Sequence, residues 1–479
     1  MNLPMVTKYN RESANGLFTP PNSLFHDQYK TAHAFVDGET FALRSKTFQS
    51  LLRRALFLTY HVAPRDADIK RLVAQMECTA LFEGPLKRLV VRVGQAKGVF
   101  FYDLLHGEAV RVSPGAWEVV PAPILFRRHS HQRPQVQPVR NGDPWAIFDF
   151  VNIAEPDRLL FLVATICSFV PDIVHPALAL FGGEGTGKSM AFCVVKRLVD
   201  PSLVDVLIAP KKLLELTQVL SHHYFSPLDN LSAIPESMSN LLAQAITGGG
   251  FSKRRLYTND EDIIYELKRC IGVGGINLLI TNPDLMDRAL LFPLKEIGEK
   301  LSELELLARF EESRPHILGG IFDVLARAMA LYPQVQVSEL PRLADFYQWG
   351  CAIAEALGGM GSQFQEAFLR NIASKGAQLV HGDAFLEAVL RFMHRREVWR
   401  GYVKDAWEIL ARIAGPDARD ASFPKSPRML RQSLGRIRGT LDKNGITCTI
   451  SDRHDEKGFP ISFRKAGNLV QMLQATEKA

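Results

Sequence analysis

The sequence lacks the features that mark secreted, membrane-spanning and zinc-binding proteins. Its six cysteines include no Cys-x-x-Cys pair and have no histidines close by, which argues against structural zinc and against a disulfide framework. Met1–Ser13 contains no apolar segment of the kind that a secretory signal needs. The longest apolar run, Leu159–Val170, is too short to span a bilayer and predicts a buried helix. We therefore expect a cytoplasmic protein with no membrane contact.

The chain also lacks a strong net charge, internal repeats and long polar tracts. A net charge of +6 over 479 residues is mild, so the positions of the basic residues matter more than their number. The apolar share of 47% is normal for a folded protein, and the length favours about three domains. Composition shifts predict the following division: an N-terminal arm (1–35), a small α/β domain (36–126), a basic proline-rich linker (127–143), a parallel α/β domain (144–297), a helical lid or connector (298–384) and a small basic module (385–479).

The small α/β domain is predicted from its periodicity. Helical spacing covers 46–60 and 65–77, and the short segments 89–93, 98–104 and 109–112 are rich in β-branched or aromatic residues, as strands are. The linker that follows has no periodicity. A solvated spacer is the simpler interpretation of the linker, because exposed linkers are commonly charged; phosphate contact is the alternative for its arginines Arg127, Arg128, Arg133 and Arg140.

Apolar strand candidates alternate with helical segments in the next domain. The strand candidates are 177–181, 203–208, 224–228 and 276–281. This alternation is typical of a parallel sheet with helices on both faces. Further helical segments follow up to about residue 373.

A glycine-rich loop joins the first of these strands to a helix. The spacing G-x-x-x-x-G-K-S in a strand–loop–helix setting is that of a P-loop, which binds the phosphates of ATP. Glycines let successive backbone N–H groups turn inward and form an anion nest at the helix N-terminus. We expect Lys188 to reach the β- and γ-phosphates and Ser189 to ligate Mg²⁺. The nucleotide-binding residues are Gly182, Gly183, Glu184, Gly185, Thr186, Gly187, Lys188 and Ser189.

A P-loop needs a second acidic group for Mg²⁺, usually at the end of a neighbouring strand. Asp229 is the candidate, although Ser226 and Pro227 make an imperfect strand and an ordinary turn aspartate is the alternative. Asn230 follows where many ATPases carry a glutamate that polarises water. Glu184 is another candidate for that base.

The glycine-rich loop and four motifs that follow it resemble a known family. The motifs are Asp229–Pro235, Thr247–Phe251, Arg254–Thr258 and Pro283–Arg288. They resemble the AAA+ ATPases of bacterial phages and mobile elements, which are similar to superfamily 3 and poxvirus-type helicases. The resemblance implies a hexameric ring that hydrolyses ATP at subunit interfaces and moves along DNA in replication of its element, with other replication proteins as further partners. An AAA+ switch or loader that binds DNA without unwinding it is the alternative.

The resemblance also implies roles for single residues. Asp229-Asn230 matches the family's own Asp-Asn. The family's sensor asparagine aligns with Gly274, or the role falls to Asn282 at the polar end of the strand candidate 276–281; we favour Asn282. Arg288 is the first choice for the arginine that acts on the neighbouring subunit's ATP, followed by Arg254 and Arg255, and surface ion pairs are the alternative.

Residues 251–267 alternate around an acidic turn and predict a hairpin. In superfamily 3 helicases such a hairpin grips DNA in the pore. Lys253 and Arg255 stand at its start and are expected to contact DNA, whereas its acidic tip is a poor phosphate ligand.

The basic module contains a helix predicted over 425–441, with Ser426 as its N-cap and Pro427 in its first turn. Its apolar residues face a core, and Arg428, Arg431 and Arg438 gather on another face. With the helix 403–413 and two strands, 446–450 and 459–463, it predicts a winged helix. We expect the arginine face to bind DNA, with protein contact as the alternative.

Overall fold

The computed structural model describes residues 23–254, 262–298, 302–337, 340–381, 384–419, 423–451, 454 and 458–465. The chain divides into two compact units, residues 1–369 and residues 370–479. Within the described ranges, no helix combines the length and the apolar character that crossing a bilayer requires.

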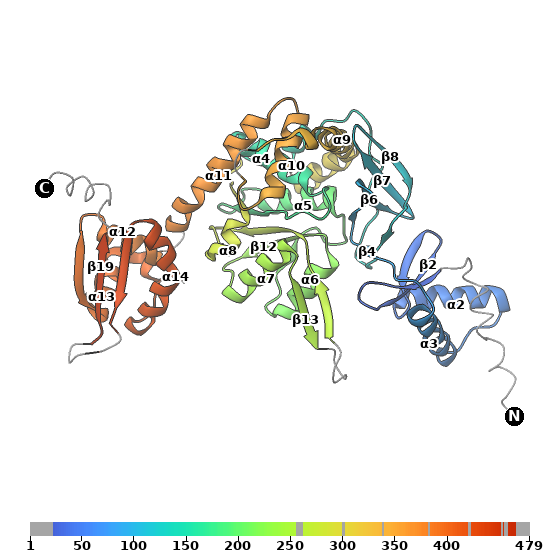
Figure 1. The fold of residues 1–479 in the computed structure, drawn as a ribbon, viewed down its shortest axis with the longest axis horizontal. Helices are drawn as coiled ribbons and strands as arrows, with labels where there is room; N and C mark the ends of the chain where they lie inside the picture. The colour runs from blue at the N-terminus through green and yellow to red at the C-terminus, as the bar shows by residue number, and fades with distance from the viewer. Residues whose placement is uncertain are drawn as a thin grey trace. The chain divides into compact units, whose positions relative to one another are not determined.

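A parallel sheet of five strands forms the centre of the first unit. The strands lie in the order β11 (Leu207–Ile208), β12 (Phe225–Leu231), β15 (Cys270–Gly275), β10 (Ala177–Phe181) and β16 (Ala289–Pro293). In the view of Figure 1, α4 (Glu155–Cys167) and α5 (Lys188–Val199) lie above this sheet, and α6 (Leu213–His222) and α7 (Glu236–Thr247) lie below it. The predicted mixed α/β fold with a parallel sheet is confirmed, and α4 is the buried helix expected from its apolar run.

One strand of this sheet is not where its sequence pattern placed it. The prediction of a strand over 276–281 is wrong, because the strand next to β10 is β15, six residues earlier, and the chain beyond it is irregular. The predicted strand 203–208 shortens to β11, and the predicted strand 224–228 becomes β12 in spite of Pro227. A parallel strand that is buried on both faces has to fit between helices. The glycines of β15 fit this space, and for this reason residues 270–275 form the strand in place of 276–281.

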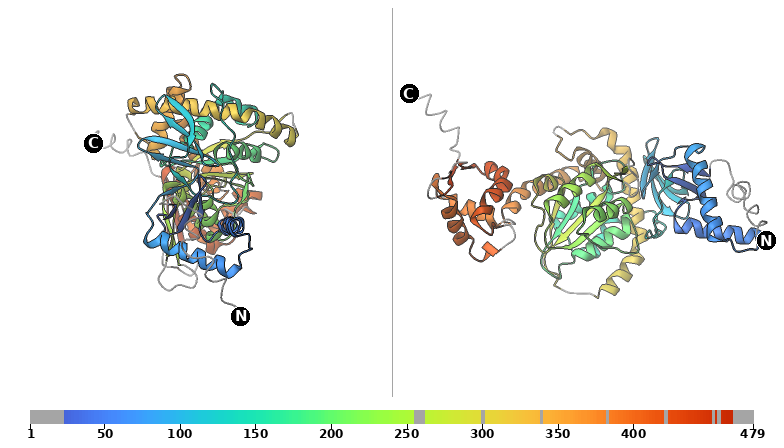
Figure 2. Two further views of the ribbon diagram at one scale, coloured as in Figure 1. Left: turned by 90° about the vertical axis from the view of Figure 1, so that its right-hand side faces the viewer. Right: turned by 90° about the horizontal axis from the view of Figure 1, so that it is seen from below.

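The helical segment is more continuous than expected. The sequence patterns of 302–313 and 317–332 predict two separate helices. These residues form the single helix α9 (Glu303–Leu331), which contains Pro315 and runs beside the β5–β8 sheet in Figure 2. α10 (Ala344–Ala356) packs on both α9 and α4, and α11 (Gly361–His381) follows. Short elements complete this part: η1 (Pro144–Asp149), the hairpin of β13 (Gly250–Arg254) and β14 (Asp262–Glu266), α8 (Pro283–Asp287) and η2 (Tyr332–Gln334).

The N-terminal region contains two separate cores. Strands β1 (Leu24–His26), β2 (Ala32–Val36) and β3 (Glu39–Ala42) pack with α2 (Lys46–Tyr60) and α3 (Asp66–Phe82). Residues 23–35, expected to belong to a loose arm, are therefore folded, because Phe25 and Ala34 are fully buried.

A four-stranded antiparallel sheet follows, and its side chains share one hydrophobic core with the central sheet. It consists of β5 (Val93–Ala96), β6 (Val99–Leu105), β7 (Glu108–Ser113) and β8 (Ala116–Pro121), and a small pair, β4 (Leu89–Val90) and β9 (Leu125–Phe126), adjoins it. Trp117 and Tyr102 of this sheet stack against Phe322 of α9 at ring distances of 5.7 and 5.5 Å. The expected domain over 36–126 is thus divided, since its second half shares one continuous apolar core with the central sheet.

The segment 127–143 is packed and is not a solvated spacer. Arg127 forms an ion pair with the buried Asp27 at 2.5 Å, and Arg128 forms one with the buried Asp103 at 2.5 Å. The guanidinium of Arg140 lies over the ring of Trp117. Of the four arginines considered for phosphate contact, these three are held by protein groups, although Arg140 is exposed, as is Arg133.

The second unit is a small α/β module. Its elements are α12 (Ala384–Met393), β17 (Val398–Tyr402), α13 (Val403–Ala414), η3 (Gly415–Arg419), η4 (Pro427–Met429), α14 (Leu430–Lys443), β18 (Ile446–Ile450) and β19 (Pro460–Lys465). The strands pair in the order β17, β19, β18, all antiparallel. The expected cap is wrong: Ser426 precedes the short η4 turn without a side-chain cap bond, and α14 begins only at Leu430.

A buried cluster of charged side chains connects α5, the start of β12 and the segment before β5 within the first unit. The carboxylate of Asp200, at the end of α5, accepts hydrogen bonds from Arg92 Nε at 3.1 Å and Lys196 Nζ at 2.7 Å. It also accepts from the backbone N–H groups of Tyr224 and Phe225 at 2.9 and 3.2 Å. Burial opposes ionisation of Asp200, but Lys196 and Arg92 outweigh it and hold the pKa of the carboxyl below its usual range.

Replacement of Asp200 by Asn should destabilise the first unit strongly. Arg92 and Lys196 would remain buried as charges without their carboxylate, which typically costs about 3–5 kcal/mol. Asp205→Asn is the matched control, since Asp205 pairs with Arg197 in a partly exposed position and such pairs contribute about 1 kcal/mol or less. Denaturant unfolding of the two variants measures the difference. Equal losses would contradict a special role for the buried cluster.

Candidate functional site

The glycine-rich loop, residues 182–189, connects β10 to α5 as the sequence predicts. Gly185 and Gly187 adopt positive φ angles of 72° and 82°, which residues with a Cβ atom rarely adopt. Gly187 is the N-cap of α5, so the loop ends at a helix N-terminus whose first N–H groups have no helical partner. The backbone therefore offers N–H donors and the positive end of a helix dipole at one place.

Lys188 lies folded over this loop. Its Nζ donates to the carbonyl oxygens of Gly182 and Gly183 at 2.8 and 2.7 Å and to Thr186 Oγ1 at 3.2 Å. Glu184, the other charged residue of the loop, is exposed at the turn of the loop. The ammonium group is thus held at the mouth of the loop by weak neutral acceptors, which an anion could replace.

Asp229 lies beside the loop, on the neighbouring part of the sheet. Its Oδ2 accepts a hydrogen bond from Ser189 Oγ at 2.5 Å, and the residue is 7% exposed. Asn230 follows with a positive φ of 56°, at a bulge where the pairing of β12 with β15 shifts. The turn of the chain at Asn230 leaves the carboxylate facing the first turn of α5 and exposes the asparagine. Ser189 and Asp229, the two residues predicted to ligate Mg²⁺, are therefore in direct contact.

A glycine strand makes room for this contact. A Cβ atom on Gly274 would lie 2.1 Å from Asp229 Oδ1, and a Cβ on Gly272 would lie 2.5 Å from the ring of Phe192 in α5. Heavy atoms cannot approach so closely, so β15 has to carry glycine where α5 and the Asp229 carboxylate cross it. The resemblance aligns Gly274 with an asparagine. In this chain the Asp229 carboxylate occupies the space that a side chain at position 274 would need.

Asn152 braces the loop and was not predicted from the sequence. Its side-chain amide donates to the carbonyl oxygen of Thr186 at 3.1 Å and to that of Lys295 at 2.7 Å. It joins the loop to the segment that follows β16. No pattern in the sequence marks this asparagine, because it lies in an irregular segment before α4.

Asn282 does not occupy the place expected of a sensor at a strand end. It is the N-cap of α8, where its side-chain oxygen accepts from the N–H groups of Asp284 and Leu285, and its Nδ2 donates to Asn240 Oδ1 at 3.1 Å. The residue that follows β15 most closely with a polar side chain is the exposed Asn277. Its neighbour Ile276 accepts a backbone hydrogen bond from Gly182 at 3.1 Å, so Asn277 stands next to the loop.

The candidate arginines are placed unequally. Arg288, at the end of α8, forms an ion pair with Asp284, which also pairs with Arg342. Lys253 and Arg254 lie on β13, whose pairing with β14 confirms the predicted hairpin; in Figure 1 this hairpin points away from the sheet. Arg255 and the turn of the hairpin lie outside the described residues.

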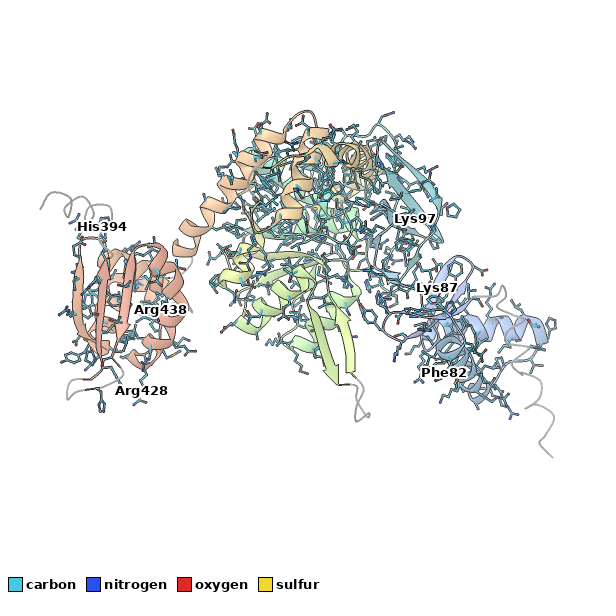
Figure 3. All side chains as sticks on the ribbon, viewed as in Figure 1. Phe82, Lys87, Lys97, His394, Arg428 and Arg438 are labelled. Carbon is cyan, nitrogen blue, oxygen red and sulfur yellow. The ribbon has the colours of Figure 1, made fainter. Side chains whose placement is uncertain are left out.

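The helix α14 separates an apolar face from a basic one. Leu430, Leu434, Ile437 and Leu441 are buried, as their spacing predicts. Arg428, Arg431 and Arg438 are exposed, and Figure 3 shows Arg428 and Arg438 at the surface of the module. The three charges lie on and just before a single helix, which is the arrangement expected of a polyanion-binding face.

The oxygen atoms of Ser189 and Asp229 fit Mg²⁺ in chemistry. Mg²⁺ prefers one or two protein oxygens and completes its shell with water and phosphate oxygens, and the 2.5 Å contact brings two such protein oxygens together. Over the residues that the structure describes, no group of three or more histidine, cysteine or acidic side chains could hold a metal ion by itself.

Two family models match consecutive parts of the chain. Residues 146–370 match the family described as actinomycete integrative conjugative element replication protein, and residues 385–473 match the C-terminal domain of that replication protein, RepA. Together they cover about two thirds of the chain, and they make it a mobile-element replication protein. The first match contains the glycine-rich loop, and the second contains α14.

A search of curated proteins gives no match. Among solved structures, the chain is similar to the C-terminal region of NrS-1 in its apo A form, with 13% identity and a TM-score of 0.40 over 93% of this chain and 96% of that chain. A second apo structure of the same region, residues 305–718, gives 12% identity and a TM-score of 0.39 with the same coverage.

Replacement of Gly274 by Ala should disturb the contact between Ser189 and Asp229. The added methyl group would displace the carboxylate, and overpacking of this kind costs about 1–3 kcal/mol. Gly298→Ala is the control, because an added Cβ there meets no atom within 4 Å. Thermal unfolding should show a lower midpoint for Gly274→Ala alone. An unchanged midpoint would show that Asp229 moves aside without cost.

Proposed function

We propose that this replication protein is an ATP-dependent DNA translocase of the helicase type that works as a ring in replication of its mobile element. The observation that carries the proposal is the 2.5 Å contact of Ser189 with Asp229 beside the glycine-rich loop. It puts a hydroxyl and a carboxylate where a P-loop ATPase needs them.

The sheet order supports this assignment. The strand that leads into the loop, β10, is separated from the strand that carries Asp229 by one further strand, β15. The resemblance implies a sensor at the polar end of a buried strand, and β15 ends beside the glycine-rich loop. We assign that role to the end of β15, near Asn277, in place of Asn282.

Each loop group has a part in binding ATP. The N–H groups around Gly185 and Gly187 bind the phosphates, and Asn152 holds the loop in register with the end of β16. Lys188 leaves its carbonyl acceptors and pairs with the β- and γ-phosphates, a charge-assisted contact that is stronger than the neutral ones it replaces. Ser189 and Asp229 would hold Mg²⁺, which when bound would supply positive charge against the phosphate oxygens.

Asn230 and Glu184 are the groups placed to orient the attacking water. Both are exposed next to the loop, Asn230 after Asp229 and Glu184 within the loop. Arg288, or Arg254, acts on the ATP of the neighbouring subunit in the ring. For Arg288 this requires release from Asp284, which holds it within its own chain.

The second unit supports a DNA-binding role. We assign this module as a winged helix with α14 as its recognition helix, an assignment supported by the order helix, strand, helix, helix and two strands, with the first strand next to the last. Arg428, Arg431 and Arg438 would contact phosphates along one face. Lys253 and Arg255 of the hairpin are proposed as a second DNA contact.

ATP turnover should depend on Lys188 and rise with DNA. Lys188→Ala removes a phosphate contact from a partly exposed side chain, so we expect a folded protein with no turnover, whereas the exposed Lys211→Ala should behave as wild type. Phosphate release by the purified chain, with and without single-stranded DNA, measures both. Turnover by Lys188→Ala would refute the ATP site, and turnover that ignores DNA would favour a nucleotide switch.

Removal of the α14 arginines should weaken DNA binding. With Arg428, Arg431 and Arg438 replaced by Ala, the slope of log affinity against log salt should flatten by about one unit for each lost phosphate contact. The control removes the same charge elsewhere in the module, at the exposed Arg395, Lys404 and Arg412. Anisotropy titrations with duplex DNA at several salt concentrations measure the slope. Equal effects of the two triple variants would mean that only net charge matters.

A further inference from the structure

A cavity of about 380 Å³ lies in the first unit, away from the glycine-rich loop. Its wall comes from four places: the N-terminal turn at Gln28–Thr31, the strand segment 88–93 with Arg127 and His129, the segment 171–175, and the ends of α6 and α7 with Lys268 and Arg269. The volume is within the range of small-ligand sites, about 300–1,000 Å³. None of the residues assigned to ATP or to DNA lines it.

The wall carries more positive than negative charge. Four basic side chains line the cavity, Arg88, Arg127, Lys268 and Arg269, against one carboxylate, that of Asp172. Arg88 lies 3.7 Å from Asp172, and Arg127 pairs with Asp27 behind the wall. Two cations therefore have no carboxylate of their own among the described residues.

Arg269 is the more unusual of these two cations. Its guanidinium donates to the carbonyl oxygens of Leu220, Lys268 and Ser221 at 2.9, 3.0 and 3.2 Å. Burial lowers the pKa of this guanidinium, and the nearby Arg127 lowers it further. A charge surrounded by neutral dipoles is stabilised only in part, so an anion in the cavity would be attracted to it.

Two histidines of the wall carry buried ring nitrogens without a protein partner. His175, only 4% exposed, donates from Nε2 to the carbonyl oxygens of Cys167 and Val170 at 3.0 Å, which leaves its Nδ1 as an acceptor without a protein partner. His129 Nε2 is also buried without a partner, while the ring of His129 stacks on that of His222 at 4.2 Å. Buried polar atoms of this kind are rare in folded proteins and call for a ligand or water.

The remaining wall is mainly apolar. Leu89, Val91, Val93 and Pro171 supply it, and Tyr29 adds an aromatic side chain to the lining. A ligand that suits both halves carries an anionic group and a flat, weakly polar body with hydrogen-bonding edges. We propose that this cavity binds a nucleotide, with its phosphate toward Lys268 and Arg269 and its base on the apolar wall.

The nucleotide has two chemical sources, a free nucleotide or one unit of a single-stranded DNA. Both present the same phosphate and base, and they differ in whether the chain continues beyond the cavity. The cavity does not share residues with the glycine-rich loop. Binding in the cavity can therefore be tested independently of ATP hydrolysis.

The test uses the full chain with Lys188→Ala, which removes the lysine contact to nucleotide at the glycine-rich loop. dTMP and a short oligothymidylate are titrated separately, by calorimetry and by anisotropy. Ser221→Trp fills the cavity from α6, and Lys268→Glu reverses a wall charge. Gln218→Trp on the same helix and Lys97→Glu on the β5–β6 turn are the matched controls, since both residues are exposed and neither lines the cavity. Figure 3 shows Lys97 on this turn.

We expect Ser221→Trp and Lys268→Glu to weaken binding about tenfold or more, and the controls to stay within about twofold. Loss with dTMP identifies a free nucleotide as the source, and loss with the oligothymidylate alone identifies a DNA strand. Equal affinities of cavity and control variants for both probes would overturn the proposal, as would failure of both probes to bind the parent chain. If Ser221→Trp does not fold, Lys268→Glu alone decides.

Discussion

The buried carboxylate of Asp200 holds the functional parts of the first unit in one frame. It ends α5, the helix that begins at the glycine-rich loop, and it accepts from the backbone where β12 starts. Lys196 of α5 also donates to the carbonyl oxygen of Phe225 at 2.7 Å. The far end of α5 is thereby fixed to the near end of β12, the strand that carries Asp229. Because Ser189 and Asp229 lie at the opposite ends of these elements, their 2.5 Å contact depends on this anchor.

The same anchor includes a residue from outside the central sheet. Arg92, in the segment between β4 and β5, is fully buried and donates both to Asp200 and to the carbonyl oxygen of Pro201. Buried ion pairs contribute little net stability, but breaking one is costly, so they favour one arrangement over others. The segment between β4 and β5 is therefore fixed against the central parallel sheet, and the wall of the cavity next to it is fixed as well.

The sequence predicted what depends on neighbours along the chain. The glycine-rich loop, α2, the 250–266 hairpin and the buried face of α14 follow from local spacing and were located correctly. The strand β15 was missed because its identity depends on Phe192 and Asp229, which fill the space above Gly272 and Gly274. The apolar 276–281 segment had the better strand pattern, but it cannot lie where α5 crosses the sheet. Likewise, no local pattern connects Arg92 with Asp200 or Asn152 with Thr186.

The mild net charge combines cations that pair with buried carboxylates and cations that do not. In segment 127–143, Arg127 and Arg128 form ion pairs with the buried Asp27 and Asp103. The charges of these two arginines therefore stabilise the fold. By contrast, Lys188 and Arg269 rest on carbonyl oxygens, which stabilise a cation less than a carboxylate does. A lysine or arginine held by neutral dipoles keeps most of its attraction for an incoming anion. The partner of each cation, and not the local density of basic residues, therefore separates the groups that hold the fold together from those available to phosphate.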